Sequence, residues 1–89
     1  RLGSEQVAYS PIVGGGANSC TIHYITNRDQ LKDGDMLLID AGGEFHNYAS
    51  DITTTFPVNC KFTEAQKAIY ELVLKAQQAA VALVRPNLR

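Results

Sequence analysis

The sequence lacks the features that define several large classes of protein. No apolar run approaches the roughly 18 residues of a membrane-spanning helix. Its 8 Lys and Arg residues form no basic patch for nucleic acid. Repeats and low-complexity tracts are also absent. With a net charge of −1 and 45% hydrophobic residues, the 89-residue chain has an ordinary soluble composition. We expect one cytoplasmic domain over residues 1–89, with no membrane or nucleic-acid partner and marginal stability.

Cysteine is scarce, and its placement limits the kinds of site that it can build. Cys20 and Cys60 are the 2 cysteines of the chain, and no CxxC motif is present. The absence of that motif argues against a zinc ribbon. Two isolated cysteines in an enzyme-like composition are typical of free thiols in a reducing compartment, although a disulfide between them stays open.

Glycine and proline divide the first part of the chain into short segments. Residues 7–13 are rich in strand formers but include Pro11, which predicts an edge or bulged strand. The glycine-rich residues 14–19 predict a loop with positive φ angles. They lack the GKS/T ending and the GxGxxG spacing of phosphate-binding loops. Residues 20–25 predict a short strand, and residues 26–35 predict a polar connection.

The last part of the chain predicts one long helix. Thr63 to Gln66 form a capping box that opens the helix, which we expect to end near Val84. An apolar stripe at helical spacing predicts a core-facing side. Its members are Ala65, Ile69, Leu72, Val73, Ala76, Ala80 and Leu83. Strands joined by hairpins and followed by one helix predict an α+β fold, an antiparallel sheet with the long helix packed on one face.

The stretch LLIDAGGEFHNYASDITTTFP, residues 37–57, predicts a β-hairpin with its turn at His46 and Asn47. In the register that follows, Gly42 faces Asp51. Because side chains alternate along a strand, Asp40 shares a face with Gly42 and therefore with Asp51. The two aspartates are then diagonal neighbours with Cα atoms roughly 7–8 Å apart.

Two carboxylates at this separation repel each other, so a positive group is expected to offset them. A divalent metal or metal pair fits, because oxygen ligands suit hard ions such as Mn²⁺ or Mg²⁺. A Lys or Arg from elsewhere is a second explanation, and solvation of both side chains on an exposed face, the usual fate of strand aspartates, is a third. Two details favour the metal. Gly42 and Gly43 clear space beside Asp40, and the apolar MLLI before Asp40 places it at the end of a buried strand.

Several longer motifs extend the pattern through most of the chain: SPIVGGGANSCTIHY, LKDGDMLLIDAG, YASDIT, TFPVN and KFTEAQKAIYELVL. Together they resemble aminopeptidase P, the Xaa-Pro aminopeptidase branch of the creatinase, prolidase and methionine aminopeptidase superfamily. The resemblance implies the first half of a "pita-bread" metallopeptidase catalytic domain. Prolidase and methionine aminopeptidase share the aspartate spacing and remain alternatives, but HYITN, DITTTFPVN and FTEAQKAIYE favour aminopeptidase P.

The resemblance also implies roles for individual residues. Asp40 and Asp51 match metal ligands of a dinuclear site, usually manganese, and Asp51 matches the ligand that bridges both ions. His23 matches a catalytic histidine that stabilises the reacting peptide group; without that match it is a hydrogen-bonded core residue. Thr53, on the face of Asp51, is either a hydrogen-bond partner of the ligands or simply a strand former. The implied reaction is release of the first residue of an Xaa-Pro peptide by a metal-bridging hydroxide.

The chain also departs from the family pattern. Thr54 replaces an arginine, which removes a structural ion pair, and Cys60 replaces a glycine, which strains the backbone if φ is positive there. The His and the two Glu ligands of the family's second half are absent from this sequence. Two carboxylates alone hold a metal weakly, so we expect the isolated chain to be inactive. It would pair with the missing half or form a homo-oligomer; the alternative is a non-catalytic half-domain or binding module.

Overall fold

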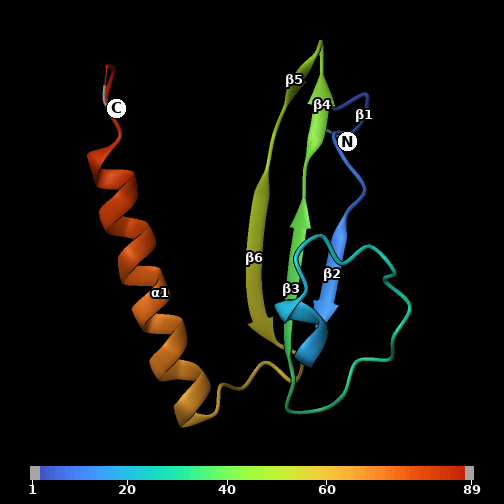
Figure 1. The fold of residues 1–89 in the computed structure, drawn as a ribbon, viewed down its shortest axis with the longest axis vertical. Coiled ribbons are helices and arrows are strands. Elements are labelled where there is room, and N and C mark those ends of the chain that lie inside the picture. The colour runs from blue at the N-terminus through green and yellow to red at the C-terminus, as the bar shows by residue number, and fades with distance from the viewer. Residues whose placement is uncertain (1–2, 88–89) are drawn as a thin grey trace.

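The computed structural model describes residues 3–87. The strands are β1 (Gln6–Val7), β2 (Ile12–Gly15), β3 (Met36–Ala41), β4 (Gly43–Phe45), β5 (Tyr48–Ala49) and β6 (Ile52–Pro57), and the helices are the 3₁₀ helix η1 (Gly16–Cys20) and α1 (Glu64–Leu83). All strand pairs are antiparallel, in two sheets of order β1-β4-β5 and β2-β3-β6. Figure 1 shows the strands as one tall layer with α1 alongside it. The predicted α+β class is confirmed.

One long hairpin runs from β3 through β4 to the turn and back through β5 to β6. Its register is continuous, from the pair beside the turn down to Asp40 opposite Thr53. His46 and Asn47 form the turn with φ angles of 47° and 68°. These values lie in the left-handed region that tight hairpin turns require. The predicted turn and register are therefore confirmed.

Gly42 marks the place where this hairpin passes from one sheet to the other. A Cβ atom on Gly42 would lie 1.7 Å from the carbonyl oxygen of Ser50 and 3.0 Å from Cε1 of Tyr9. Only glycine allows so close an approach. The crossing is held by Ser50, whose backbone N–H donates to the carbonyl of Gly43 at 2.9 Å, while its Oγ accepts from the Gly43 N–H at 2.9 Å.

The region before β3 differs from the prediction in two places. Residues 14–19 have the predicted positive φ angle at Gly16, where φ is 54°, but they are not a loop, because β2 continues to Gly15 and η1 begins at Gly16. Residues 20–25 do not form a strand, because the chain turns at His23, where φ is 56°. Both sides of β3 are already occupied, by β2 and by β6. The strand-like pattern around His23 therefore has no edge of β3 with which to pair.

The edge-strand prediction for residues 7–13 is confirmed with one refinement. The segment divides into β1 and β2, and each is the outer strand of its sheet. Pro11 lies between them, where it leaves no ladder hydrogen bond unmade. The side-chain amide of Asn27 then covers part of the β2 edge. It accepts from the N–H of Val13 at 3.1 Å and donates to the carbonyl of Pro11 at 2.7 Å.

Helix α1 begins as the capping box predicts. Thr63 Oγ1 accepts from the Gln66 N–H at 3.2 Å, and Gln66 Oε1 accepts from the Thr63 N–H at 3.0 Å. The Gln66 side chain also donates to the carbonyl of Gly34 at 2.8 Å. This bond joins the start of the helix to the turn before β3. In the described residues, no helix is long and apolar enough to cross a membrane.

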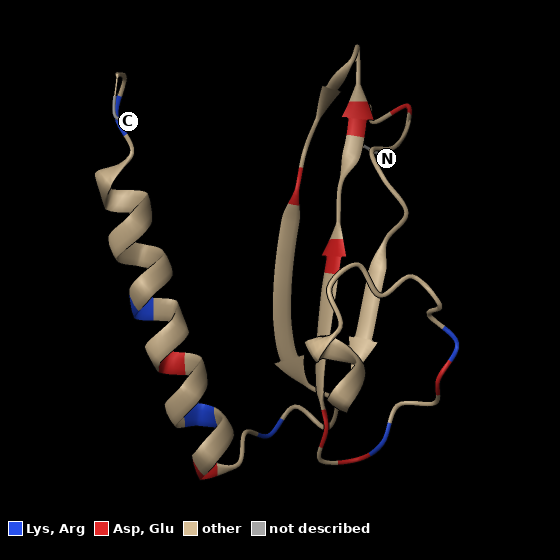
Figure 2. Ribbon diagram, in the orientation of Figure 1, with Lys and Arg blue, Asp and Glu red and all other residues tan. Residues whose placement is uncertain are grey.

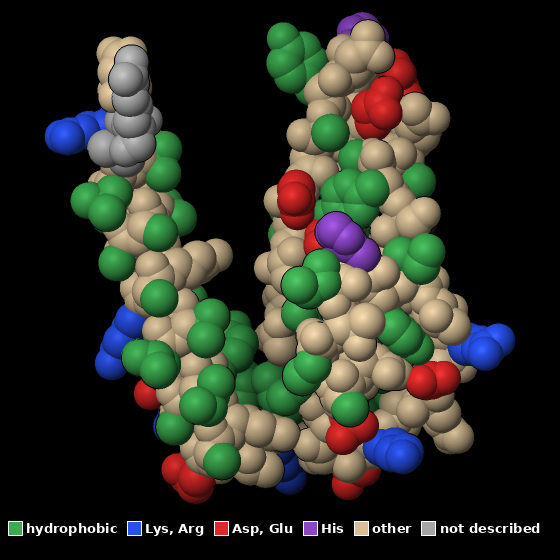
Figure 3. Space-filling view, in the orientation of Figure 1, with side chains coloured by type: hydrophobic (Ala, Val, Ile, Leu, Met, Phe, Trp, Pro, Cys, Tyr) green, Lys and Arg blue, Asp and Glu red, His purple; other side chains and the backbone are tan. Residues whose placement is uncertain are grey.

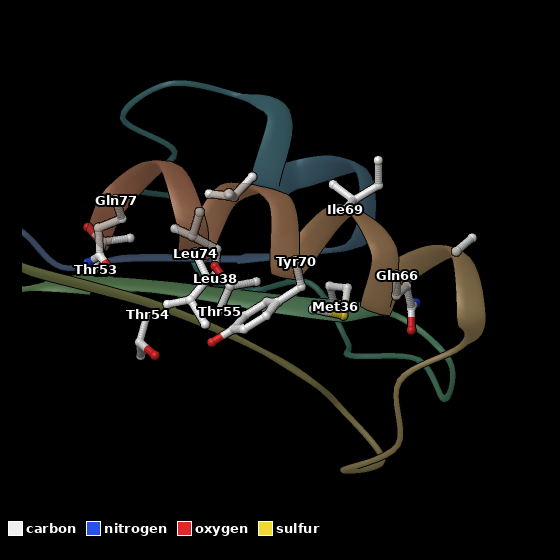
Figure 4. A pocket seen from close by; sticks show the side chains of 12 residues that line it. Met36, Leu38, Thr53, Thr54, Thr55, Gln66, Ile69, Tyr70, Leu74 and Gln77 are labelled. Atoms are coloured by element: carbon white, nitrogen blue, oxygen red, sulfur yellow. The ribbon is translucent and has the colours of Figure 1, made fainter. Parts of the chain in front are cut away.

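The prediction that the apolar stripe of α1 is buried is wrong for this structure. Ile69 is 64% exposed and Leu72 is 65% exposed, and α1 contains no buried residue. Figure 3 shows hydrophobic side chains along the helix and a hollow between the helix and the strands. The hollow has a volume of about 760 Å³ and is lined on the strand side by Met36, Leu38 and three threonines (Figure 4). Ile69 and Leu74 of α1 line the opposite side, so apolar side chains of the helix and of β3 face each other across the hollow.

Both cysteines are free and exposed, so the free-thiol prediction is confirmed. Cys60 lies in the turn after β6, where its N–H donates to the carbonyl of Pro57 at 3.0 Å. Its φ angle is 63°. A side chain with a Cβ is strained in this left-handed region, so the expected strain at Cys60 is present.

Candidate metal centre

The side chains of Asp40 and Asp51 converge on one phenol group. The hydroxyl of Tyr9 donates a short hydrogen bond to Oδ1 of Asp40 and lies 3.2 Å from Oδ1 of Asp51. Asp40 is half-buried near the end of β3, and Asp51 is exposed between β5 and β6. The two carboxylates that the sequence predicts as neighbours are thus held around a single oxygen atom.

The backbone explains why these two aspartates meet. Asp40 lies in the central strand of its sheet, paired with Ile12 on one side and Thr53 on the other. Asp51 lies in the short link that carries the hairpin from β5 to β6. The link follows the close approach of Gly42 and Ser50, so the position of Asp51 depends on that contact. Figure 2 shows acidic positions on neighbouring segments in the middle of the strand layer.

The electrostatics of the pair distinguish among the three explanations for it. Residues 36–57 contain no Lys or Arg, and within residues 3–87 no salt bridge joins either aspartate to a basic side chain. A Lys or Arg partner is therefore not found in the part of the chain that the structure describes. Asp40 is half-buried, which makes simple solvation of both carboxylates a poor fit. Within residues 3–87, the two carboxylates therefore have no positively charged partner.

Tyr9 responds to the charge of both carboxylates. The hydrogen bond to Asp40, followed by desolvation and by the hydrogen bond to Asp51, raises the pKa of Tyr9. The cause is direct, because a phenolate here would add a third negative charge to two existing ones. Tyr9 therefore stays protonated and remains a hydrogen-bond donor. Because the Tyr9 hydroxyl is neutral, its hydrogen bonds do not change the net negative charge of the two carboxylates.

Sequence reasoning missed Tyr9. It lies in the link between β1 and β2, beside Gly42, and the N–H of the preceding Ala8 donates to the Gly42 carbonyl at 2.9 Å. The sequence signal for such a contact is Gly42, because a glycine within a strand indicates that another part of the chain approaches its backbone closely. Identifying Tyr9 as that neighbour required the pairing of β1 with β4, which local patterns do not reveal.

His23 lies in the segment between η1 and β3, outside the strands around the two aspartates. It is exposed on a left-handed turn, and among the described residues no hydrogen bond joins it to Asp40 or Asp51. The segment that carries His23 is anchored by Asn18. The Asn18 amide donates to Asp29 Oδ2 at 2.7 Å and to the Tyr24 hydroxyl at 3.2 Å. The reading of His23 as a buried core histidine does not hold, because its side chain is exposed.

Thr53 lies where the register predicts. It is directly opposite Asp40 in the ladder between β3 and β6, so the two side chains share a face. Within residues 3–87 its hydroxyl makes no hydrogen bond to either aspartate. The side-chain hydrogen bonds to the two aspartates come from Tyr9.

The donor chemistry of this site suits a hard divalent cation, although the ligand set is incomplete. Tyr9 contacts one oxygen of each carboxylate, and in the described residues Oδ2 of Asp40 and Oδ2 of Asp51 accept no hydrogen bond. Carboxylate oxygens that are free of other hydrogen bonds are the kind of donor that Mg²⁺ and Mn²⁺ prefer. Within residues 3–87 no group of three His, Cys, Asp or Glu side chains could hold a metal ion. A stable centre therefore needs ligands beyond these two.

Comparison with known proteins places this chain in a family. The model of metallopeptidase family M24 matches residues 1–89. The chain is 58% identical over 80 residues to an Xaa-Pro aminopeptidase of Haemophilus influenzae, covering 90% of this chain and 19% of that protein. It is 50% identical over 87 residues to an Xaa-Pro aminopeptidase of Escherichia coli, covering 98% of this chain and 20% of that protein.

Solved structures agree with the sequence comparison. A zinc-substituted E. coli aminopeptidase P in complex with product matches with a TM-score of 0.90 and 50% identity, covering 94% of this chain and 19% of that chain. The chain thus spans about a fifth of the length of the relatives it matches, 20% and 19% for the two aminopeptidases above. The resemblance that the motifs indicate is confirmed: the chain belongs to metallopeptidase family M24.

Proposed function

We propose that this chain forms part of the active site of a metal-dependent aminopeptidase that releases the N-terminal residue from peptides with proline in the second position. The convergence of Asp40 and Asp51 around Tyr9 is the observation that carries the proposal. It occurs in a chain of metallopeptidase family M24 whose similar proteins are named Xaa-Pro aminopeptidases.

Asp40 and Asp51 would hold the metal through their carboxylates, together with ligands from outside residues 1–89. A pair of divalent ions of the hard, oxygen-preferring class is proposed, with Mn²⁺ as the expected metal. When bound, such ions supply Lewis acidity and bring the pKa of water close to neutral. Asp51, exposed in its link, has the freedom to contact two ions, whereas Asp40 is held in the middle of a sheet.

His23 and Thr53 have supporting roles in this proposal. His23 is exposed and able to donate a hydrogen bond to the carbonyl oxygen of a bound peptide, while Asn18 anchors the segment that carries it. Thr53 lies directly opposite Asp40, within reach of that carboxylate once its hydroxyl turns toward it. Neither residue binds the metal, so each would act on the substrate or on a ligand.

Residues 1–89 are proposed as the first half of the catalytic domain. The exposed stripe of α1 and the hollow beside it support a further packing partner, either a second half of the domain or another copy of the chain. The isolated 89 residues would accordingly be inactive, because two carboxylates are too few ligands for a dinuclear centre. Exposed free Cys20 and Cys60 support a cytoplasmic location.

Peptide hydrolysis by the full-length protein with added Mn²⁺ tests this function. We expect cleavage of an Xaa-Pro peptide, little cleavage of the matching Xaa-Ala peptide, and a loss of at least about 100-fold in Asp40→Asn. Asp33→Asn is the matched control, because Asp33 lies in the exposed turn before β3 and should leave the rate unchanged. Equal cleavage of both peptides, or full activity in Asp40→Asn, would contradict the proposal.

A further inference from the structure

We propose that Tyr9 is a positioning residue for metal binding, whose hydroxyl holds Asp40 and Asp51 in the convergent orientation that a divalent ion needs. The inference rests on the proposed function and deepens it. Tyr9 itself does not bind the metal. It acts through the carboxylates, by fixing the direction in which their free oxygens point.

The hydrogen-bond pattern suits this role. The Tyr9 hydroxyl contacts Oδ1 of Asp40 and Oδ1 of Asp51, one oxygen on each side chain. Each carboxylate keeps its second oxygen for a metal. Tyr9 therefore need not leave when an ion binds, and the same hydrogen bonds orient the ligands with and without it. Hydrogen bonds from surrounding groups to ligating carboxylates commonly have this function.

Tyr9 is itself held in place by the backbone on both sides of it. The preceding Val7 pairs with Gly43, and Ile12 pairs with Asp40. The N–H of Ala8 donates to the carbonyl of Gly42 at 2.9 Å. The short link from β1 to β2 is thus joined to both sheets, and the half-buried ring rests against the bare backbone of Gly42. The position of the hydroxyl is consequently set by strand pairing.

Removing the hydroxyl would leave the two carboxylates free to move apart. They repel each other, and in residues 3–87 no Lys or Arg is paired with either to oppose the repulsion. Asp51 is exposed and would turn into solvent with little resistance. A metal would then have to bring the ligands together itself. Loss of such a supporting hydrogen bond typically lowers metal affinity by about 10–100-fold.

Titration of the full-length protein with Mn²⁺, followed by calorimetry, tests the inference. Tyr9→Phe removes the hydroxyl and keeps the ring, and we expect its Mn²⁺ affinity to fall by about 10–100-fold. Tyr48→Phe is the matched control. It makes the same chemical change at a side chain that is 83% exposed on β5, and its affinity should equal that of the wild type. Thermal unfolding without added metal checks that both variants are folded.

A second readout separates positioning from a general loss of stability. Substitution with Co²⁺ gives a visible absorption spectrum that reports ligand geometry, and we expect this spectrum to change in Tyr9→Phe and to stay the same in Tyr48→Phe. Tyr9→Phe with wild-type Mn²⁺ affinity, to within about twofold, and an unchanged Co²⁺ spectrum would overturn the role of Tyr9 while leaving the proposed function standing. Failure of the wild type to bind Mn²⁺, or unaltered binding in Asp51→Asn, would overturn both.

Discussion

Gly42 approaches Ser50 so closely that a Cβ on Gly42 would lie 1.7 Å from the Ser50 carbonyl oxygen. This contact brings the hairpin across between the two sheets, directly beside the aspartate pair. Gly42→Ala must push the strands apart, and we expect it to lower the free energy of unfolding by about 3 kcal/mol or more. Urea denaturation measures the change.

Gly34→Ala is the control for Gly42→Ala. A Cβ on Gly34 would meet no atom within 4 Å, but Gly34 has a φ angle of +86°. Its replacement should cost only the strain of the left-handed backbone, about 1–2 kcal/mol. A Gly42→Ala loss no larger than that of Gly34→Ala would show that the close approach does not limit the hairpin.

Cys60 offers a substitution that should stabilise the protein. Its φ of 63° strains any residue with a Cβ, and glycine would relieve this strain. Cys60→Gly should raise the free energy of unfolding by about 1 kcal/mol, after the greater chain entropy of glycine is subtracted. The same replacement at Cys20, in η1, should give no gain. A lower urea midpoint for Cys60→Gly than for the wild type would contradict the strain.

The capping box at Thr63 predicts a measurable loss. Thr63→Ala removes the acceptor for the Gln66 N–H, and we expect a cost of about 1 kcal/mol with a reduced helical circular dichroism signal. Thr26→Ala, in an exposed irregular segment, should have almost no effect. The helix has no buried residue, so its dependence on this cap should be strong. Equal effects of the two substitutions would argue against a role for the cap.

Stability should decline in alkali partly because of Tyr24. Desolvation, followed by the negative charge of Asp29, raises the pKa of Tyr24 in the folded protein. An unfolded tyrosine has a pKa of about 10. The contribution of Tyr24 is therefore complete below about pH 10 and is lost as the pH rises from there through the folded pKa. Denaturation midpoints measured from pH 8 upward, with about 10 as the onset, should fall less steeply in Tyr24→Phe than in the wild type. Parallel curves would rule out this contribution.

Local signals predicted much of the fold. Turn-forming His46 and Asn47 set the hairpin register, and that register alone placed Asp40 and Asp51 on one face. The cap at Thr63 likewise depends on residues close to it in the sequence. Each feature is decided within a few residues, so the amino-acid pattern contains it.

Features that depend on distant partners could not be predicted in this way. The pattern around His23 is typical of a strand, but the chain has no free edge of β3 left for it. Tyr9 reaches the aspartates through the pairing of β1 with β4 and of β2 with β3, which joins segments far apart in the sequence. The stripe on α1 predicts a core side, yet its residues are exposed beside the hollow, because burial depends on packing partners far away in the sequence.

The central claim is that Asp40 and Asp51 hold a divalent metal, and crystals of the full-length protein grown with Mn²⁺ test it most directly. Anomalous scattering at the manganese absorption edge locates the ion without assumptions about its ligands. We expect a strong anomalous peak within coordination distance of both carboxylates, and no peak there in Asp51→Asn crystals. A clear peak elsewhere, with Asp40 and Asp51 free of metal, would contradict it.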